Sequence, residues 1–284
     1  MSNCDITIRA RDGYSLAASV IGGAGRGAVI VNSATGVRRQ FYRRFSEYLA
    51  GQGSAIVTYD YRGIGDSGAD KTPNGLKARM RDWALLDAYS VLEWTADRYL
   101  GKKITVIGHS FGGQCLGLLE NYERIDRIVL VGAQSGYWGH FAGFRKFRLW
   151  LLWYAGFPAL TRLLGYFPGK RLGLGEDLPA GVALEWARWC RQRHYLMDDL
   201  GPELPSYFES LKAPILAYKI SDDSYAPDGA VDALLDYYRA APVKVRSVSP
   251  GDCGVKGIGH FGLFREPLKE TLWAEIAAWV ATAN

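Results

Sequence analysis

Short runs of apolar and β-branched residues alternate with segments of helical periodicity along most of this chain. Three such runs lie at residues 28–33, 55–61 and 104–107, and each is followed by a stretch with apolar residues at helical spacing. The clearest stretch is 76–100, whose apolar stripe consists of Met80, Trp83, Ala84, Ala88, Val91, Leu92 and Thr95. This alternation predicts an α/β fold, a mostly parallel central sheet with helices on both faces.

The beginning of the chain has a different pattern. Residues 5–10 and 15–21 are joined by Arg-Asp-Gly, a turn that suits a hairpin of antiparallel edge strands. Further strands are expected at 128–132, 214–220 and 244–248. The sheet is therefore expected to be mixed, with about eight strands. The segment 113–121, which follows one of the central strands, is expected to be helical.

The alternation breaks between residues 135 and 211. Strand signals disappear there, and tryptophans occur in amphipathic helical pieces that proline and glycine interrupt. These tryptophans are Trp138, Trp150, Trp153, Trp186 and Trp189. We expect residues 135–211 to form an inserted helical cap on one core domain, which would consist of residues 1–134 and 212–284.

A Gly-His-Ser-Phe-Gly motif at residues 108–112 lies directly between an apolar strand and the expected helix. A serine on so sharp a turn needs small neighbours, and its hydroxyl then points out of the sheet. Alternatively, the glycines form an ordinary turn and the serine only caps the helix. The position of the motif favours Ser110 as a nucleophile, with the N–H group of Phe111 as a donor to the oxyanion.

A serine hydroxyl is a weak nucleophile unless an adjacent base takes its proton. His260 lies in a glycine-bearing loop after the last predicted strand, at the sheet edge where Ser110 is also expected. The other histidines are His109, His140 and His194. His109 is expected to point elsewhere, and the other two lie in the predicted cap as surface or pocket residues. His260 is therefore the predicted base.

Two neighbouring aspartates, Asp222 and Asp223, directly follow the strand predicted at 214–220. A carboxylate at this place can orient the imidazole and stabilise its charged form. The other aspartate is expected to bond the backbone of its own turn. The residues alone leave open which aspartate has which role. The chain order Ser, Asp, His matches serine hydrolases with a strand–serine–helix turn.

These motifs resemble the α/β-hydrolase superfamily, in particular its serine aminopeptidase and monoglyceride-lipase-like branch. The matching pieces are residues 32–37, 60–67, 108–113, 223–227 and 259–262, and the resemblance extends over nearly the whole chain outside the predicted cap. In that family the triad aspartate usually stands four residues before a proline, which implies a triad of Ser110, Asp223 and His260. The resemblance also implies acyl transfer through an acyl-enzyme, with no metal ion and no organic cofactor.

The family commonly has a His-Gly motif after the third strand, where a second N–H group binds the oxyanion. This chain has Asn-Ser-Ala-Thr-Gly-Val at residues 32–37 instead. The resemblance places Thr35 at the donating position. A backbone donor requires no particular side chain, so the oxyanion hole can survive this difference.

The predicted cap should form much of the substrate pocket. Its pocket candidates are Trp138, Phe141, Trp153 and Trp186, although each could equally serve to pack the cap onto the core. The predicted function is hydrolysis of a carboxylic ester or thioester with a small to medium apolar acyl group. Two alternatives stay open: an acyltransferase with the same triad, and a ligand-binding receptor with little turnover.

Charge and hydropathy limit the partners of the chain. A net charge of +5 and a pI of about 8.9 are mild, and the arginines are spread along the sequence, so no nucleic-acid partner is predicted. The most apolar stretch, 149–161, is interrupted by Gly156 and Pro158 and is shorter than the roughly 18 residues of a spanning helix. Flanking Arg145, Lys146 and Arg148 predict at most a weak contact of the cap with a lipid interface.

The four cysteines are far apart and share no C-x-x-C spacing. They predict neither a zinc site nor a disulfide framework, and they fit a reducing cytoplasm. The start of the chain lacks the features of a signal peptide, which agrees with this expectation. No feature of the sequence specifies an oligomeric state.

Overall fold

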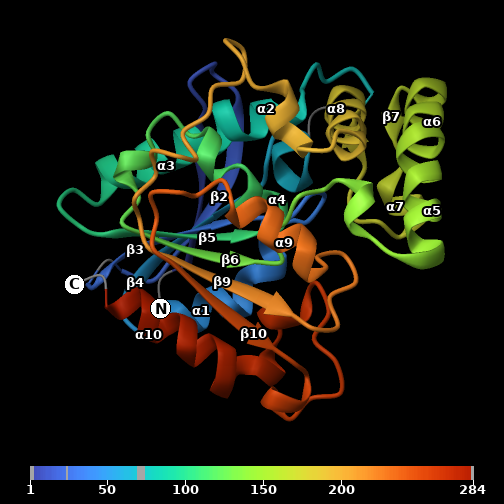
Figure 1. Cartoon of the computed structure of the whole chain (residues 1–284). Coiled ribbons are helices and arrows are strands. Elements are labelled where there is room, and N and C mark those ends of the chain that lie inside the picture. The colour runs from blue at the N-terminus through green and yellow to red at the C-terminus, as the bar shows by residue number, and fades with distance from the viewer. Residues whose placement is uncertain (1–2, 24, 69–73, 283–284) are drawn as a thin grey trace.

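The computed structural model describes residues 3–23, 25–68 and 74–282. Among these residues, eight strands form one sheet in the order β1-β2-β4-β3-β5-β6-β9-β10 (Figure 1). The strands are β1 (Asn3–Arg9), β2 (Ser15–Ile21), β3 (Gly27–Asn32), β4 (Ser54–Tyr59), β5 (Ile104–His109), β6 (Arg127–Val131), β9 (Ile215–Ile220) and β10 (Val243–Val248). β2 is antiparallel to both its neighbours, and the other pairs are parallel. The predicted mixed, mostly parallel sheet is confirmed.

The centre of the sheet is covered on both faces. Every residue of β3, β4 and β5 is buried, as expected for parallel strands made of nearly continuous apolar runs. On one face lie α1 (Arg43–Gly51) and α10 (Ala274–Ala281) (Figure 1). Leu49 of α1 and Ile276 of α10 belong to the same buried cluster as Val29 of β3. This cluster is the core on that face.

The helical stretch predicted at 76–100 packs on the opposite face. It contains α2 (Met80–Asp82), a wider π-type turn at Trp83–Ala88 and α3 (Tyr89–Arg98). Every residue of the predicted apolar stripe is buried. Val91 belongs to one buried cluster with Ile30 of β3 and Val106 of β5, so the stripe faces the sheet as its spacing predicts.

The segment after β5 differs from the helix expected at 113–121. α4 covers only Phe111–Gln114, and a short 3-10 turn follows at Leu116–Leu118. These two elements contain three glycines, and glycine is a poor helix former. Gly117 also lies so close to Phe208 that an added Cβ would be 2.2 Å from its ring. Close packing thus shortens the helix that the apolar pattern suggests.

Residues 135–211 are mainly helical, as expected. They form α5 (Gly143–Leu151), α6 (Phe157–Leu164), α7 (Gly169–Leu172) and α8 (Ala180–Arg191), together with the short paired strands β7 (Tyr166–Phe167) and β8 (Leu178–Pro179). The two-residue strands are too short to show an alternating pattern in the sequence. Figure 1 shows these four helices grouped at one side of the sheet. Buried side chains such as Val182 and Trp189 join the core cluster that contains α3.

The division into a core domain and a cap stays a prediction. Of the predicted core domain, residues 1, 2, 24, 69–73, 283 and 284 lie outside the described residues. The π-type turn at Lys269–Trp273, which leads into α10 in the last part of the chain, packs with α1 from the first part, and the rings of Trp273 and Phe45 have centroids 5.4 Å apart. The two sequence segments assigned to the core domain are therefore packed together in the structure.

α5 and the π-type turn that follows it at Leu152–Gly156 carry exposed aromatic side chains. The rings of Phe144, Phe147, Trp150 and Tyr154 follow one another with centroids 5.5–6.2 Å apart. This surface lies where the sequence predicts a weak lipid-interface contact, and that contact stays a prediction. Within the described part of the chain, no helix has the length and apolar character needed to cross a membrane.

Candidate active site

Ser110 stands at the turn between β5 and α4. Its backbone has φ 52° and ψ −118°, a conformation that residues other than glycine rarely adopt. A Cβ at position 108 would lie 2.4 Å from Gly113 Cα, and one at position 112 would lie 2.3 Å from Asn32 O. Only glycine fits at these two places, which explains why the sequence around the serine is so rich in glycine.

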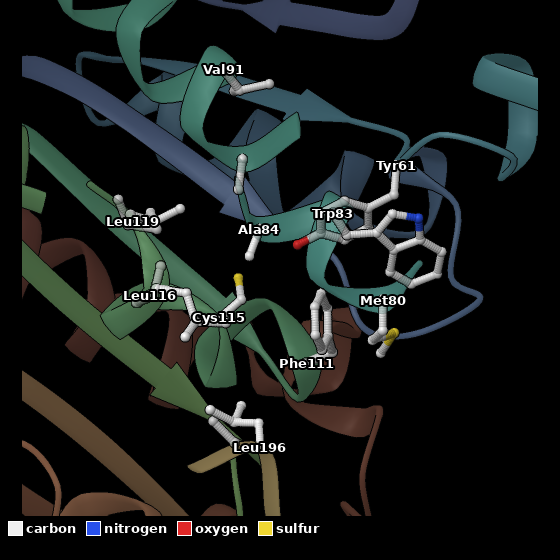
Figure 2. Packing of buried hydrophobic residues seen from close by; sticks show 14 of the residues in the cluster. Tyr61, Met80, Trp83, Ala84, Val91, Phe111, Cys115, Leu116, Leu119 and Leu196 are labelled. Carbon is white, nitrogen blue, oxygen red and sulfur yellow. The ribbon is translucent and has the colours of Figure 1, made fainter. Parts of the chain in front are cut away.

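Several contacts hold the strained turn in place. The N–H group of Ser110 donates to Val131 O at 2.9 Å, and the serine carbonyl accepts from Gly113 N at 2.9 Å. The ring of Phe111 is buried edge-on against Tyr61 and Trp83, with centroids 5.8 and 5.6 Å away (Figure 2). The backbone hydrogen bonds of Ser110 and the buried ring of the next residue, Phe111, therefore hold the serine in position.

The structure brings His260 and Asp223 together from loops after β10 and β9. His260 Nδ1 and Asp223 Oδ2 are 2.7 Å apart, and both side chains are buried. The other carboxylate oxygen of Asp223 accepts from the N–H groups of Tyr225 and Ala226 at 2.8 and 3.1 Å. With both oxygens engaged, this carboxylate is fixed in a position that can orient the imidazole.

Asp222 makes a different set of contacts. Its two carboxylate oxygens accept from the N–H groups of Ile258 and Gly259, each at 2.9 Å. These residues immediately precede His260 in the chain. Asp222 therefore anchors the loop that carries the histidine, whereas the local sequence pattern predicts only a bond within its own turn. The separate loop partner is a contact that sequence reasoning missed.

A buried hydrogen-bond chain joins this loop to the one after β3. His109 Nε2 lies 2.9 Å from His260 O, so it donates to that carbonyl, and His109 Nδ1 accepts from Tyr42 Oη at 2.8 Å. The Tyr42 hydroxyl in turn accepts from Ala34 N at 3.0 Å. Burial lowers the pKa of His109 well below its ordinary value, which keeps the ring neutral as these bonds require. His109 does not line the cavity, which agrees with the expectation that it points elsewhere. Its hydrogen bonds to Tyr42 and to the His260 carbonyl, however, were not predicted from the sequence.

Ser110 and His260 line one cavity of about 200 Å³. Thr35 also lines it, and the N–H groups of Thr35 and Phe111 make no hydrogen bond with any described residue. Most of the wall is apolar, formed by Val37, Phe141, Leu149, Leu152, Trp153, Phe157, Phe167, Leu174, Leu178, Trp186 and Phe261. The cavity thus combines a hydroxyl, an imidazole and the unpaired N–H donor of Thr35 with an apolar surface; Phe111 is not one of the lining residues, but its N–H group directly follows Ser110 in the chain.

Three of the four predicted pocket aromatics, Phe141, Trp153 and Trp186, line this cavity. Trp138 is not among its lining residues; its ring packs against Tyr137 and beneath the Lys146 ammonium. Gly136 and Phe141, which lie on either side of Trp138 in the chain, do line the cavity, so only the direction of the Trp138 side chain keeps it out. The periodicity of the sequence does not show which of these aromatic side chains line the cavity and which pack elsewhere.

The remaining histidines lie elsewhere. His140 and His194 line a separate open cleft, and His194 is exposed with Nδ1 2.8 Å from Asp198 Oδ1. Burial lowers the pKa of His140. The described residues include no group of three or more His, Cys, Asp or Glu side chains arranged to hold a metal ion.

A serine at a strand–helix turn and an imidazole–carboxylate pair, all at the carboxyl ends of parallel strands, are typical of hydrolases with an α/β fold. The model of the alpha/beta hydrolase family matches residues 28–272. Because this match covers most of the chain, the protein belongs to the alpha/beta hydrolase family. The resemblance noted in the sequence is confirmed at this level.

Solved structures agree on the fold. A carboxyl esterase from Bacillus coagulans is 14% identical, with a TM-score of 0.66 over 100% of this chain and 99% of that one. An esterase from Exiguobacterium antarcticum is 18% identical, with a TM-score of 0.65 over 98% and 99%. The Paleococcus ferrophilus monoacylglycerol lipase is 16% identical, with a TM-score of 0.61 over 95% and 99%. No curated protein matches the sequence.

Proposed function

We propose that this protein is a serine hydrolase that cleaves a carboxylic ester or thioester with a small to medium apolar acyl group. The observation that carries the proposal is that the strained Ser110 and His260 line the same apolar cavity, while Nδ1 of His260 is held by Asp223. The esterase and lipase neighbours have the same fold, which supports this choice of reaction within the family.

In the proposed mechanism, Ser110 Oγ attacks the acyl carbonyl while His260 Nε2 takes its proton. Asp223 fixes the imidazole through Nδ1 and stabilises its charged form. The N–H groups of Phe111 and Thr35 bind the negative oxygen of the tetrahedral intermediate. His260 then gives the proton to the leaving group as the acyl-enzyme forms. In the second half, His260 takes a proton from water as the water attacks the acyl-enzyme, and it returns that proton to Ser110 Oγ as the acid leaves. No metal ion or organic cofactor takes part in these steps.

The 135–211 segment would act as a cap that selects the substrate. It supplies Phe141, Trp153 and Trp186 to the cavity, while the serine and histidine come from outside this segment. An apolar wall favours an apolar acyl group, and about 200 Å³ of space suits a small to medium one. All four cysteines are free thiols, which supports work in a reducing compartment such as the cytoplasm.

A fluorophosphonate probe tests the proposal directly, because it phosphonylates only an activated serine. We expect the wild-type protein to gain one adduct, mapped to Ser110 by mass spectrometry, and the Ser110→Ala variant to gain none. A series of p-nitrophenyl esters with increasing acyl length would then define the preferred chain. Absence of labelling in a folded wild-type protein would contradict the proposal and favour a binding protein with little turnover.

A further inference from the structure

The cavity also contains a guanidinium group that ester hydrolysis by itself leaves unused. Arg145, near the start of α5, lines the cavity together with Ser110 and His260. We propose that Arg145 binds a carboxylate of the substrate, so that the natural substrate is an ester or thioester with an ionised carboxyl group a few bonds from the scissile carbonyl. This inference rests on the proposed function and names the substrate class of the same site.

Arg145 lacks the partners that other buried arginines have. Each fully buried arginine of the described chain forms an ion pair: Arg39 with Asp60, Arg62 with Asp87, and Arg81 with Glu185. Arg145 is partly buried, its Nε is buried without a hydrogen-bond partner, and it forms no ion pair with any described residue. A partly buried cation without an anionic partner loses part of its hydration without compensation, and a bound anion would supply the missing partner.

Two aromatic rings hold the guanidinium in place. Its central carbon lies 5.5 Å from the centroid of Phe141 and 5.3 Å from that of Tyr225. Tyr225 is itself fixed at both backbone groups, since its N–H donates to Asp223 and its carbonyl accepts from the Gln134 side chain. Stacking leaves the edge of a guanidinium, with its N–H donors, free to bind an anion.

Tyr225 also sets the spacing within the site. The centroid of its ring lies 5.2 Å from that of the His260 imidazole and 5.3 Å from the Arg145 guanidinium carbon. Because both groups contact the same ring, the guanidinium carbon and the imidazole centroid can be no further apart than these two distances together. A substrate whose carbonyl lies at Ser110 needs only a short chain to reach Arg145 with its second carboxyl group.

Nothing else in the described cavity competes for the cation. Its lining residues include no aspartate or glutamate, and the carboxylate of Asp223 is already bonded to His260 and to backbone N–H groups. The surrounding wall is mainly apolar, which strengthens the attraction between opposite charges. A carboxylate matches a guanidinium with two parallel hydrogen bonds, so Arg145 would select for this group rather than for a neutral polar one.

The test compares anionic with neutral esters. Mono-p-nitrophenyl glutarate has its carboxylate on the acyl side, 4-(butanoyloxy)benzoate has it on the leaving-group side, and p-nitrophenyl butyrate is neutral. For each enzyme we would measure the ratio of kcat/KM for the anionic and the neutral ester. In Arg145→Gln we expect this ratio to fall about ten- to one-hundredfold for at least one anionic ester. Arg145→Lys should recover part of the lost preference for the anionic ester, because lysine keeps the positive charge but lacks the planar guanidinium that forms two parallel hydrogen bonds with a carboxylate.

Arg148→Gln is the matched control. Arg148 lies one turn further along α5, is exposed and does not line the cavity. Its loss should leave the ratio unchanged. If Arg145 only clamps the two rings, Arg145→Gln would slow anionic and neutral esters equally, and an unchanged ratio for both anionic esters would overturn the inference.

A binding measurement separates this inference from the proposed function. Monomethyl glutarate should bind to the Ser110→Ala protein in a calorimetric titration, and adding Arg145→Gln should raise its Kd about tenfold. If the wild type hydrolyses no ester but this Arg145-dependent binding is found, the proposed function fails and the anion site stands. If esters are hydrolysed and neither binding nor the ratio depends on Arg145, the inference alone fails.

Discussion

The carboxylates of Asp222 and Asp223 bind different partners although they are neighbours in the chain. Asp223 contacts the His260 imidazole, and Asp222 contacts the backbone just before that histidine. One side chain would therefore act on the proposed base itself and the other on the loop that carries it. This division is the reason that the two aspartates should differ in their effect on catalysis.

Replacement of each aspartate by asparagine tests this division. Asp223→Asn should lower kcat by about a thousandfold or more, because an amide cannot hold the required tautomer or stabilise the imidazolium. Asp222→Asn keeps one acceptor oxygen for the loop, and kcat should fall about tenfold or less. Steady-state hydrolysis of a p-nitrophenyl ester measures both. A larger loss in Asp222→Asn would transfer the orienting role to Asp222.

At the scale of elements, the end of β6 supports the imidazole–carboxylate pair. Gly132 directly follows β6 with φ 58°, and a Cβ there would lie 2.9 Å from His260 Cε1 and 3.1 Å from Asp223 Oδ2. The absence of a side chain at this strand end therefore leaves space for the two residues. The position of the end of β6 therefore limits where the His260 imidazole and the Asp223 carboxylate can lie.

Gly132→Ala should thus affect activity more than stability. The left-handed backbone costs alanine about 1–2 kcal/mol, and the added methyl group would also displace the imidazole. We expect kcat/KM to fall at least about tenfold, because small displacements of catalytic groups are costly. Gly101→Ala is the control: Gly101 has φ 71° and open space around it, so it should lose similar stability in thermal unfolding and keep its activity. Equal activity of the two variants would argue against the contact.

At the scale of the whole molecule, His109 couples folding to pH. Burial lowers its pKa in the folded protein below the ordinary value of 6.5, so below about pH 6.5 the unfolded chain binds more protons than the folded one. This group therefore destabilises the fold as the pH falls below 6.5, by at most about 1.4 kcal/mol per pH unit. Burial raises the pKa of Asp87 to about 7, which acts in the opposite sense. The contribution of His109 to the pH dependence of stability is therefore measured by comparing the wild type with a variant that lacks this histidine.

His109→Gln provides that comparison. The variant should be less stable at pH 7, because Tyr42 and the His260 carbonyl lose a well-placed partner. Between pH 6.5 and 5, however, its free energy of unfolding should depend less steeply on pH than that of the wild type, by up to about 1 kcal/mol per pH unit. Urea unfolding at several pH values measures both slopes. Identical slopes would show that His109 is not kept neutral by folding.

Much of the fold could be predicted because its signals are local. The hairpin, the parallel strands and the buried stripe from Met80 to Thr95 follow from periodicities of two and 3.6 residues, and the structure confirms them. The helix expected at 113–121 was wrong, because close approach at Gly117 is a tertiary constraint that the pattern does not contain. The placement of Ser110 beside a cavity agrees with its motif, and its catalytic role stays a prediction.

The sequence by itself determined the class of fold and the serine turn, and it predicted His260 as the base and either Asp222 or Asp223 as the acid, since these signals lie in local patterns and motifs. Only the tertiary structure decided what joins them: the anchoring of the His260 loop by Asp222, the link from Tyr42 to His109, and the unpaired Arg145 in the cavity. His109 and His260 are 151 residues apart and meet because two strands end at the same edge of the sheet. Such contacts depend on how elements pack together, and no local spacing in the chain encodes them.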